Sequence, residues 1–303
     1  MSSISPHPPS SPLLIKNVWQ ENVEEEFMSI QTLLPRYPYV AMDTEFPGIV
    51  ARPLGNFRSQ AEYLYASLRC NVDMLRVIQL GLTLCDAEGN FPPGDSPCCW
   101  QFNFRFNLDE DAYAQESIDL LIKSGIDFTA HQRKGIAVEH FGALLVQSGL
   151  VMMPNITWIS FHSIFDFGYL FKVLTGNPLP MDDVEFLDNL NILFPRFYDI
   201  KLLMRIGRNL KGGLQDLADD LQVQRVGIQH QAGSDSLLTA QVFFKLCAAF
   251  FENGKIDSER FANQLYGLTS AGFSNNPFST GGSDNLLGTT PPAHILSSPL
   301  KKK

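Results

Sequence analysis

Apolar and polar positions follow two different periods along this chain, and the two periods predict a mixed α/β fold. Short apolar runs predict strands at 39–46, 76–85 and 98–106, with turn-forming residues between them. Three strands that follow one another so closely are typical of an antiparallel meander. Before the first of them, an apolar repeat of about 3.6 residues predicts an amphipathic helix over residues 15–34.

Helical periodicity dominates the pattern after residue 110, where only two short strands are expected, at 157–161 and 198–203, the second running into a helix. A meander followed by alternating helices and strands indicates an α/β fold with a mixed central sheet, an antiparallel meander plus parallel strands, flanked by helices. The further helices are expected at 58–70, 111–123, 127–148, 163–174, 182–193, 214–221 and 235–252.

The two ends of the chain differ from the rest in composition. Residues 1–12 are rich in Ser and Pro, and residues 268–303 in Ser, Gly, Asn, Thr and Pro, so we expect both to be disordered. Residues 13–267 then form a single ordered domain, which has ample apolar material for one large core. The final Lys301-Lys302-Lys303 fits a solvated tail, and it also fits an RNA contact or an address.

Charge and cysteine content narrow the class of protein. A net charge of −9 counts against a general coater of DNA or RNA, but not against an enzyme with a narrow acidic cleft. Five cysteines without a C-x-x-C pair favour free thiols over a disulfide framework or a zinc site. Without a signal peptide pattern or a long apolar helix, we expect a soluble intracellular protein that makes no membrane contact.

Two acids stand on one face of the first predicted strand. Asp43 and Glu45 lie two residues apart in an apolar segment, which places their side chains about 7 Å apart on the same side. Two buried carboxylates so close together repel each other and lose hydration, which is costly unless a cation lies between them. Taken alone, the pair fits an exposed edge strand with solvated acids equally well.

Two more acids and a histidine precede predicted helices. Asp166 stands among aromatic residues where a strand gives way to a helix, and Asp235 stands at the start of the last predicted helix, five residues after His230. A helix N-terminus favours an ionised carboxylate. An imidazole whose pKa is near neutrality can accept a proton from water. Each acid alone would pass for a helix cap, and the histidine for a surface residue.

Together these residues are the inventory for two-metal phosphodiester cleavage. Four carboxylates supply the bridging and terminal oxygens that two divalent ions about 4 Å apart require. One ion would activate the attacking water, the other would stabilise the leaving 3′ oxygen, and His230 would accept the proton of the water. The combination is a far more specific signal than any of its parts.

At these residues the chain resembles the DEDD exonuclease superfamily in its His-containing subclass. More narrowly, it is similar to the Caf/Pop-type deadenylase subunit of the Ccr–Not complex over roughly residues 13–267. DNA proofreading exonucleases share only the sparse acids. The strings that carry the narrower resemblance are Tyr39–Arg52, Arg69–Asp73, Ile78–Leu82, Trp100–Phe106, Phe161–Leu170, Asn209–Gln215 and Gln229–Leu238.

The resemblance implies a ribonuclease H-like fold and a 3′→5′ exoribonuclease that releases 5′-AMP from poly(A). It further implies two divalent ions (Mg²⁺ or Mn²⁺), bound by the acids that match the family's metal ligands, Asp43, Glu45, Asp166 and Asp235, with His230 as the general base. The implied partners are the 3′ end of poly(A) RNA, a Not-type scaffold protein, and a Ccr-type nuclease or its adaptor. The implied location is the cytoplasm, with some nuclear presence.

Substrate contacts and alternative functions stay open at this stage. Phe46 fits a stacking position near the terminal base or a plain core position, and His162 fits a phosphate contact or a structural role. Some basic residues near the motifs are expected to line an RNA path, although each also fits a solvated surface. An adaptor with a vestigial nuclease fold, or an exonuclease for single-stranded DNA or structured RNA, would also fit. The basic residues are Arg52, Arg58, Arg69, Arg76, Arg105, Lys201 and Lys211.

Overall fold

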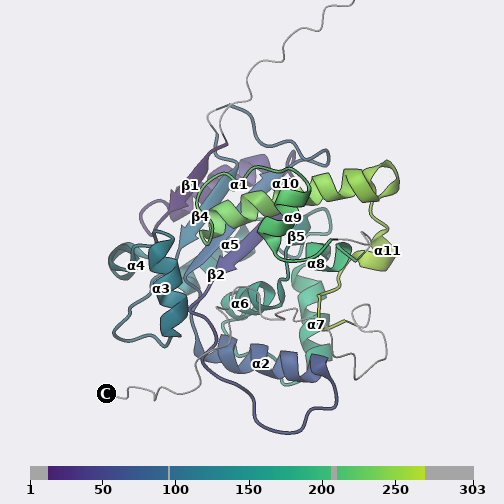
Figure 1. Cartoon of the computed structure of the whole chain (residues 1–303). Helices are drawn as coiled ribbons and strands as arrows, with labels where there is room; N and C mark the ends of the chain where they lie inside the picture. Colours follow the sequence, from purple (N-terminus) through teal and green to yellow (C-terminus); the bar gives the residue numbers. More distant parts are fainter. Residues whose placement is uncertain (1–12, 95, 206–209, 270–303) are drawn as a thin grey trace, which may run out of the picture.

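One mixed sheet organises the part of the chain that the computed structural model describes, residues 13–94, 96–205 and 210–269 (Figure 1). Its strand order is β1-β4-β3-β2-β5-β6. The central β2, β3 and β4 form an antiparallel meander, whereas β5, β6 and β1 each lie parallel to a neighbour. This confirms the predicted mixed sheet of a ribonuclease H-like fold. The strands are β1 (Ile15–Val18), β2 (Tyr39–Glu45), β3 (Gln79–Cys85), β4 (Cys99–Asn103), β5 (Thr157–Ser160) and β6 (Phe197–Asp199).

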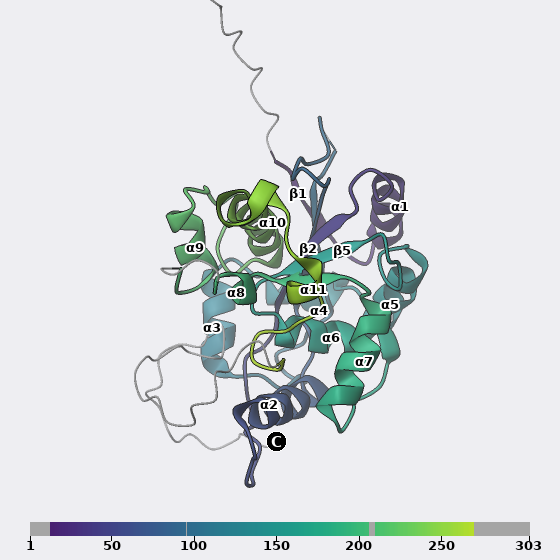
Figure 2. The ribbon, with the colours of Figure 1, turned by 90° about the vertical axis from the view of Figure 1, so that its right-hand side faces the viewer.

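Helices cover both faces of the sheet, as the view along its edge shows (Figure 2). One face packs against α1 (Val23–Leu33), α2 (Gln60–Met74), α5 (Val138–Gln147), α6 (Ile164–Thr175) and α7 (Asp183–Leu193). The other packs against α8 (Ile200–Leu203), α9 (Leu214–Asp220), α10 (Ala232–Phe250) and α11 (Ser258–Phe261), with the 3-10 turn Glu252–Gly254 between the last two. Helices α3 (Gln115–Lys123) and α4 (Phe128–Lys134) flank the meander.

The structure corrects two helix predictions. Residues 15–18 of the expected first helix form β1, because they pair in parallel with Cys99–Phe102 of β4 and complete the sheet edge. The helix expected over 127–148 is two helices, α4 and α5. They are separated at Gly135–Ile136, where Ile136 takes extended backbone and forms a bridge with Phe104. In both cases pairing with a distant strand overrides the local periodicity.

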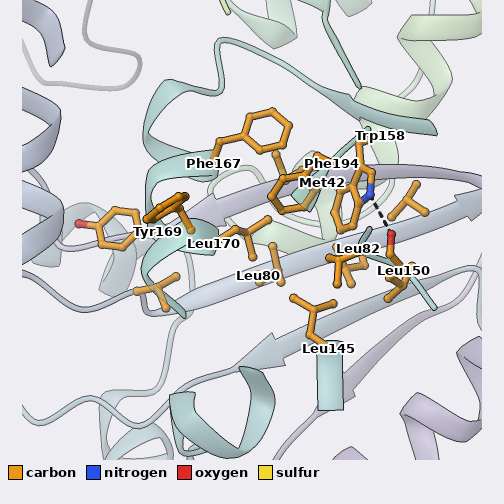
Figure 3. Close-up of a cluster of buried hydrophobic side chains, with 14 of the residues drawn as sticks. Met42, Leu80, Leu82, Leu145, Leu150, Trp158, Phe167, Tyr169, Leu170 and Phe194 are labelled. Carbon is orange, nitrogen blue, oxygen red and sulfur yellow. Dashed lines mark hydrogen bonds between the residues drawn. The ribbon is translucent and has the colours of Figure 1, made fainter. Parts of the chain in front are cut away.

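The larger core lies between the sheet and α6, and it fixes the side from which each β2 residue projects. Val40 and Met42 point into this core, whose packing around Trp158 is shown in Figure 3. The Trp158 indole N–H donates to the Leu150 carbonyl at 3.1 Å. Because side chains alternate along a strand, Ala41 faces the opposite layer, and the strand carries Asp43 and Glu45 to that side as well.

A glycine lets helix α10 approach the sheet closely. Gly81 of β3 lies directly opposite Asp43 in the β2–β3 register. A Cβ atom on Gly81 would lie 1.9 Å from the carbonyl oxygen of Ala232, the first residue of α10. Only a residue without a side chain fits there, so the first turn of α10 is held against the strand pair beside Asp43.

The ends expected to be disordered, 1–12 and most of 268–303, lie outside the described residues, whereas Leu268 packs into the larger core. None of the described helices combines the length and the apolar character needed to cross a membrane.

We predict that Gly81→Ala destabilises the fold by about 3 kcal/mol, at the upper end of the usual cost of overpacking, because the added methyl group meets backbone atoms of α10. Urea denaturation followed by circular dichroism measures this. The matched control is Gly213→Ala, since a Cβ on Gly213 would meet only the Asp216 carboxylate, at 3.8 Å. Equal stability of the two variants would contradict the close contact.

Candidate metal centre

Three elements bring the four predicted acids together. Asp43 and Glu45 end β2, Asp166 stands in the first turn of α6, and Asp235 in the first turn of α10. Asp166 and Asp235 are only 8% and 7% exposed. Burial raises the pKa of both Asp43 and Glu45 far above the usual range, and the charges of Asp235 and Asp166 raise it further. The four carboxylates therefore share one electrostatic environment.

Asp166 reaches this cluster because strand β5 is shorter than β2. The β2–β5 ladder pairs only Tyr39–Ala41, and beyond Ser160 the chain turns away into α6. The Thr44 backbone N–H, at 2.8 Å, and its hydroxyl, at 2.7 Å, donate to Asp166 Oδ1 instead. Burial raises the Asp166 pKa to about 6, although the Thr44 bonds act in the opposite direction. Both bonds fall on Oδ1, which leaves Oδ2 available to a cation.

Asp235 is held from two sides. Its Oδ2 accepts the His230 backbone N–H at 2.8 Å, and its Oδ1 accepts Nη1 of Arg225 at 2.5 Å. Arg225 is itself oriented by Gln215 Oε1, at 2.7 Å from its Nε, and by the Ser234 hydroxyl. Its charge lowers the pKa of both Asp43 and Glu45. Our sequence analysis did not single out Arg225, because it lies in an irregular segment without a pattern.

His230 lies in the left-handed region of backbone space, with φ of +63°. Such a conformation is uncommon for a residue with a side chain. Its backbone N–H bond to Asp235 stabilises this conformation. One possible ligand atom each from His230, Glu45 and Asp235 lie within 4.8 Å of one another. Burial lowers the His230 pKa, and Arg225 adds to that effect, while Asp235 opposes it. The imidazole is therefore neutral at physiological pH and can accept a proton.

Glutamine side chains anchor the start of α10. The backbone N–H groups of Ala232 and Gly233 donate to Gln79 Oε1 at 3.2 Å and Gln101 Oε1 at 2.9 Å. Both glutamines donate in turn to Gln231 Oε1. The sequence analysis missed this arrangement, although Gln79 and Gln101 are polar residues within apolar strands, and that is the signal for it. The amide array fixes the helix turn that carries Asp235.

The donor set fits divalent cations. Carboxylate oxygens are the ligands that Mg²⁺ and Mn²⁺ prefer, and the four acids converge from three elements. The nearby Arg225 offsets only part of their charge. Bound cations would remove the repulsion that raises the pKa of these groups, so the arrangement fits a metal centre better than a purely structural cluster.

The two candidate substrate contacts, Phe46 and His162, each pack against an aromatic ring. Phe46 is partly buried and stacks on Phe165, with ring centroids 5.2 Å apart at 15°. His162 lies between β5 and α6 with φ of +56°, and its backbone N–H donates to Asp199 Oδ1 at 2.8 Å. Its ring meets Tyr266 edge-on. Contact of either residue with substrate stays a prediction.

Comparison with known proteins adds an independent finding. The family model described as CAF1 family ribonuclease matches residues 18–138 and 138–243. The poly(A) ribonuclease pop2 of Schizosaccharomyces pombe is 55% identical over 258 residues, which cover 85% of this chain and 76% of that protein. The CCR4-NOT transcription complex subunit 7 of Caenorhabditis elegans is 46% identical over 291 residues, 94% of this chain and 92% of that protein.

Two solved structures are similar to the chain throughout their length. The S. pombe Pop2p structure in its Mg²⁺ and Mn²⁺ bound form has a TM-score of 0.81 at 55% identity, and the match covers 84% of this chain and 99% of that one. A yeast structure of the NOT1 MIF4G domain co-crystallised with CAF1 matches with a TM-score of 0.70 at 33% identity, over 87% of this chain and 100% of that one.

We predict that the metal-free protein loses stability as pH rises from 5 to 7. The raised pKa values mean that the folded state binds protons in this window that the unfolded state has released, so unfolding becomes easier as pH rises. Asp43→Asn should stabilise the metal-free protein at pH 7 by on the order of 2 kcal/mol, the repulsion of two charges about 7 Å apart. Thermal melting in EDTA measures both effects.

The same melting series with Mg²⁺ or Mn²⁺ provides the control. The cations should raise the melting temperature of the wild type more at pH 7 than at pH 5, because protons compete with them for the carboxylates. Asp43→Asn should lose most of this increase. A wild type whose melting temperature ignores the cations would argue against a metal centre here.

Proposed function

This chain belongs to the CAF1 family of ribonucleases, and we propose on that basis that it shortens the poly(A) tails of messenger RNA. The reaction is 3′→5′ hydrolysis of phosphodiester bonds with release of 5′-AMP. The observation that carries the proposal is the convergence of Asp43, Glu45, Asp166 and Asp235 with a neutral His230 at the carboxyl end of β2. The relative that is named a poly(A) ribonuclease supports the choice of substrate.

The four acids hold the cofactor in this proposal. Two Mg²⁺ or Mn²⁺ ions supply the positive charge and Lewis acidity that phosphodiester hydrolysis needs, in keeping with the Mg²⁺ and Mn²⁺ bound form of the S. pombe relative. Asp43 and Glu45 present their oxygens from a rigid central strand. Asp166 is oriented by Thr44, and Asp235 by Arg225 and the His230 backbone. Asp166 and Asp235 are thus oriented before the ions bind.

His230 acts as the general base in this mechanism. Its lowered pKa keeps the imidazole neutral at physiological pH. Its position beside Glu45 and Asp235 lets it take the proton of the attacking water. The rate should therefore rise with pH as the imidazole loses its proton, and level off before neutrality. We propose that Phe46, which follows Glu45 at the end of β2, contacts the terminal nucleotide.

An adaptor with an inactive fold is less consistent with these residues. A cluster of acids that never bound cations would destabilise the folded protein. Such clusters are rarely found without a neutralising partner. A general exonuclease would need the same acids, so it differs only in its substrate. A comparison of homopolymers separates the two.

The activity test uses 5′-labelled oligo(A). We expect the wild type with Mg²⁺ or Mn²⁺ to shorten it stepwise, EDTA to stop the reaction, and Asp43→Ala to abolish it. His230→Ala should lower the rate about 10²- to 10⁴-fold, the usual contribution of a general base. Gel electrophoresis of the products, with equivalent oligomers of C, G and U alongside, gives the readout.

Each outcome of that test favours one function. Faster shortening of oligo(A) than of the other oligomers supports a deadenylase, and equal rates support a general exonuclease. An intact oligomer in the presence of both metals would favour the adaptor. Melting temperatures of both variants in EDTA control for misfolding.

We further propose that the chain works as a subunit of a Ccr–Not-type complex, bound to a Not-type scaffold and to a Ccr-type nuclease or its adaptor. The relative named as a CCR4-NOT subunit and the relative co-crystallised with a NOT1 domain support this. We expect the complex to act in the cytoplasm, with some nuclear presence, as the family resemblance implies.

A groove of about 530 Å³ between α5 and α6, lined by Val138, Val146 and Val173 among others, includes none of the proposed metal ligands.

We predict that Val146→Glu prevents co-purification with a NOT1-type MIF4G domain while oligo(A) shortening continues. Val146 is 44% exposed and lines the groove, so a charge there opposes apolar docking without disturbing the core. Met28→Glu, on the exposed face of α1, is the matched control and should leave co-purification intact. Full retention of the scaffold by Val146→Glu would place the interface elsewhere.

A further inference from the structure

The sheet edge that carries the metal centre continues into a second group of polar and aromatic residues. Strands β2, β5 and β6 are parallel neighbours, so their carboxyl ends lie along the same edge. In sheets of this kind ligands bind outside the carboxyl ends of the strands. The end of β2 carries Asp43 and Glu45, whereas Phe161 and His162 follow β5, and Lys201 follows β6.

Asp199, the last residue of β6, ties this second group together. It is 1% exposed, and its Oδ1 accepts the backbone N–H groups of His162 and Lys201 at 2.8 and 3.0 Å. Its Oδ2 accepts the backbone N–H of Tyr266 at 3.1 Å. Three segments from distant parts of the chain are thereby fixed relative to one another. The carboxylate is satisfied by backbone groups, not by the ammonium of Lys201.

Two cations gather on one aromatic ring at this position. The Lys201 ammonium lies 6.0 Å from the centroid of the Tyr266 ring and 5.9 Å from that of Phe161. The Arg205 guanidinium lies 5.4 Å from the same Tyr266 centroid. Cation–π attraction favours both placements. The Lys201 ammonium at this edge would attract an anionic ligand.

Lys201 keeps bonding capacity for such an anion. Its ammonium donates to the Gly212 carbonyl at 2.6 Å, which uses one of its three N–H groups. Within the described residues it forms no ion pair. This differs from Arg225, whose charge is committed to Asp235. Lys201 therefore keeps N–H groups for an anion beside the sheet edge that carries the acids.

We propose that Lys201 and Arg205, positioned by Tyr266, bind a backbone phosphate of single-stranded RNA upstream of the bond that is cut at the metal centre. The site rests on the proposed ribonuclease function. The end of β6 lies two strand spacings from the end of β2, which is about 10 Å, so the bound phosphate belongs to the same strand a short distance from the 3′ end. Because it contacts the backbone and not a base, it contributes affinity without selecting adenine.

The binding test compares Lys201→Gln with Lys255→Gln. Lys255 is exposed beyond the far end of α10, so its substitution removes the same charge away from the edge. Affinity for fluorescein-labelled oligo(A) is measured by anisotropy in an Asp43→Ala background, which needs no hydrolysis. Lys201→Gln should weaken binding about tenfold, the value of one charged hydrogen bond, while Lys255→Gln changes it little. The slope of log affinity against log salt should fall by about 0.7.

A hydrolysis test separates this site from the metal centre. The p-nitrophenyl ester of thymidine monophosphate has a single phosphodiester and no upstream phosphate. Lys201→Gln should cleave it at the wild-type rate but show a raised KM for oligo(A), and Lys201→Arg should restore that KM. Oligomers of C and U should lose as much affinity as oligo(A).

Two results would contradict the proposed phosphate site. Equal RNA affinities of Lys201→Gln and Lys255→Gln would overturn the proposal, as would parallel loss of ester cleavage and oligo(A) cleavage in a Lys201→Gln protein with a wild-type melting temperature. If instead the wild type binds oligo(A) through Lys201 but cleaves neither substrate, the proposed nuclease activity fails while the phosphate site stands.

Discussion

Repulsion among four clustered carboxylates, two of them buried and two partly buried, is the constraint on which the rest of this structure depends. Burial and mutual charge raise the pKa of Asp43 and Glu45 far above the usual range, so the fold must hold these groups together against their own electrostatics. It does so with backbone contacts that cannot easily yield. Helix α10 lies against Gly81, and the amides of Gln79 and Gln101 accept its first N–H groups. The binding free energy of cations would come largely from relief of this stored repulsion.

Much of the site was accessible from sequence because it follows local rules. The period of two along β2 placed Asp43 and Glu45 on one side, and the starts of two helices drew attention to Asp166 and Asp235. The long strings shared with the family then joined these separate hints. The features that these local rules missed depend on tertiary contacts. The four residues of β1 fit a helix until β4 is beside them. Arg225 has no pattern around it, and its role depends on contacts with Asp235 and Gln215.

The distribution of charge along the sheet edge reconciles an acidic protein with an anionic substrate. Acids occupy the end of β2, where divalent ions would make the surface attractive to phosphate. Positive side chains stand only two strands away, at the end of β6, with the fully bonded Asp199 between. Its charge is close enough to raise the Asp166 pKa, so the two zones are electrostatic neighbours.

The hydrogen bond between the Asp235 carboxylate and the His230 backbone couples these two residues. One carboxylate holds the backbone of His230 in a strained conformation and also belongs to the acid cluster. The proposed proton acceptor and the proposed ion-binding oxygens are therefore mechanically linked. In the proposed mechanism their contributions to the rate would not be additive, since disturbing one displaces the other. For the same reason a substitution at Asp235 is expected to displace His230 as well as to remove a carboxylate from the acid cluster.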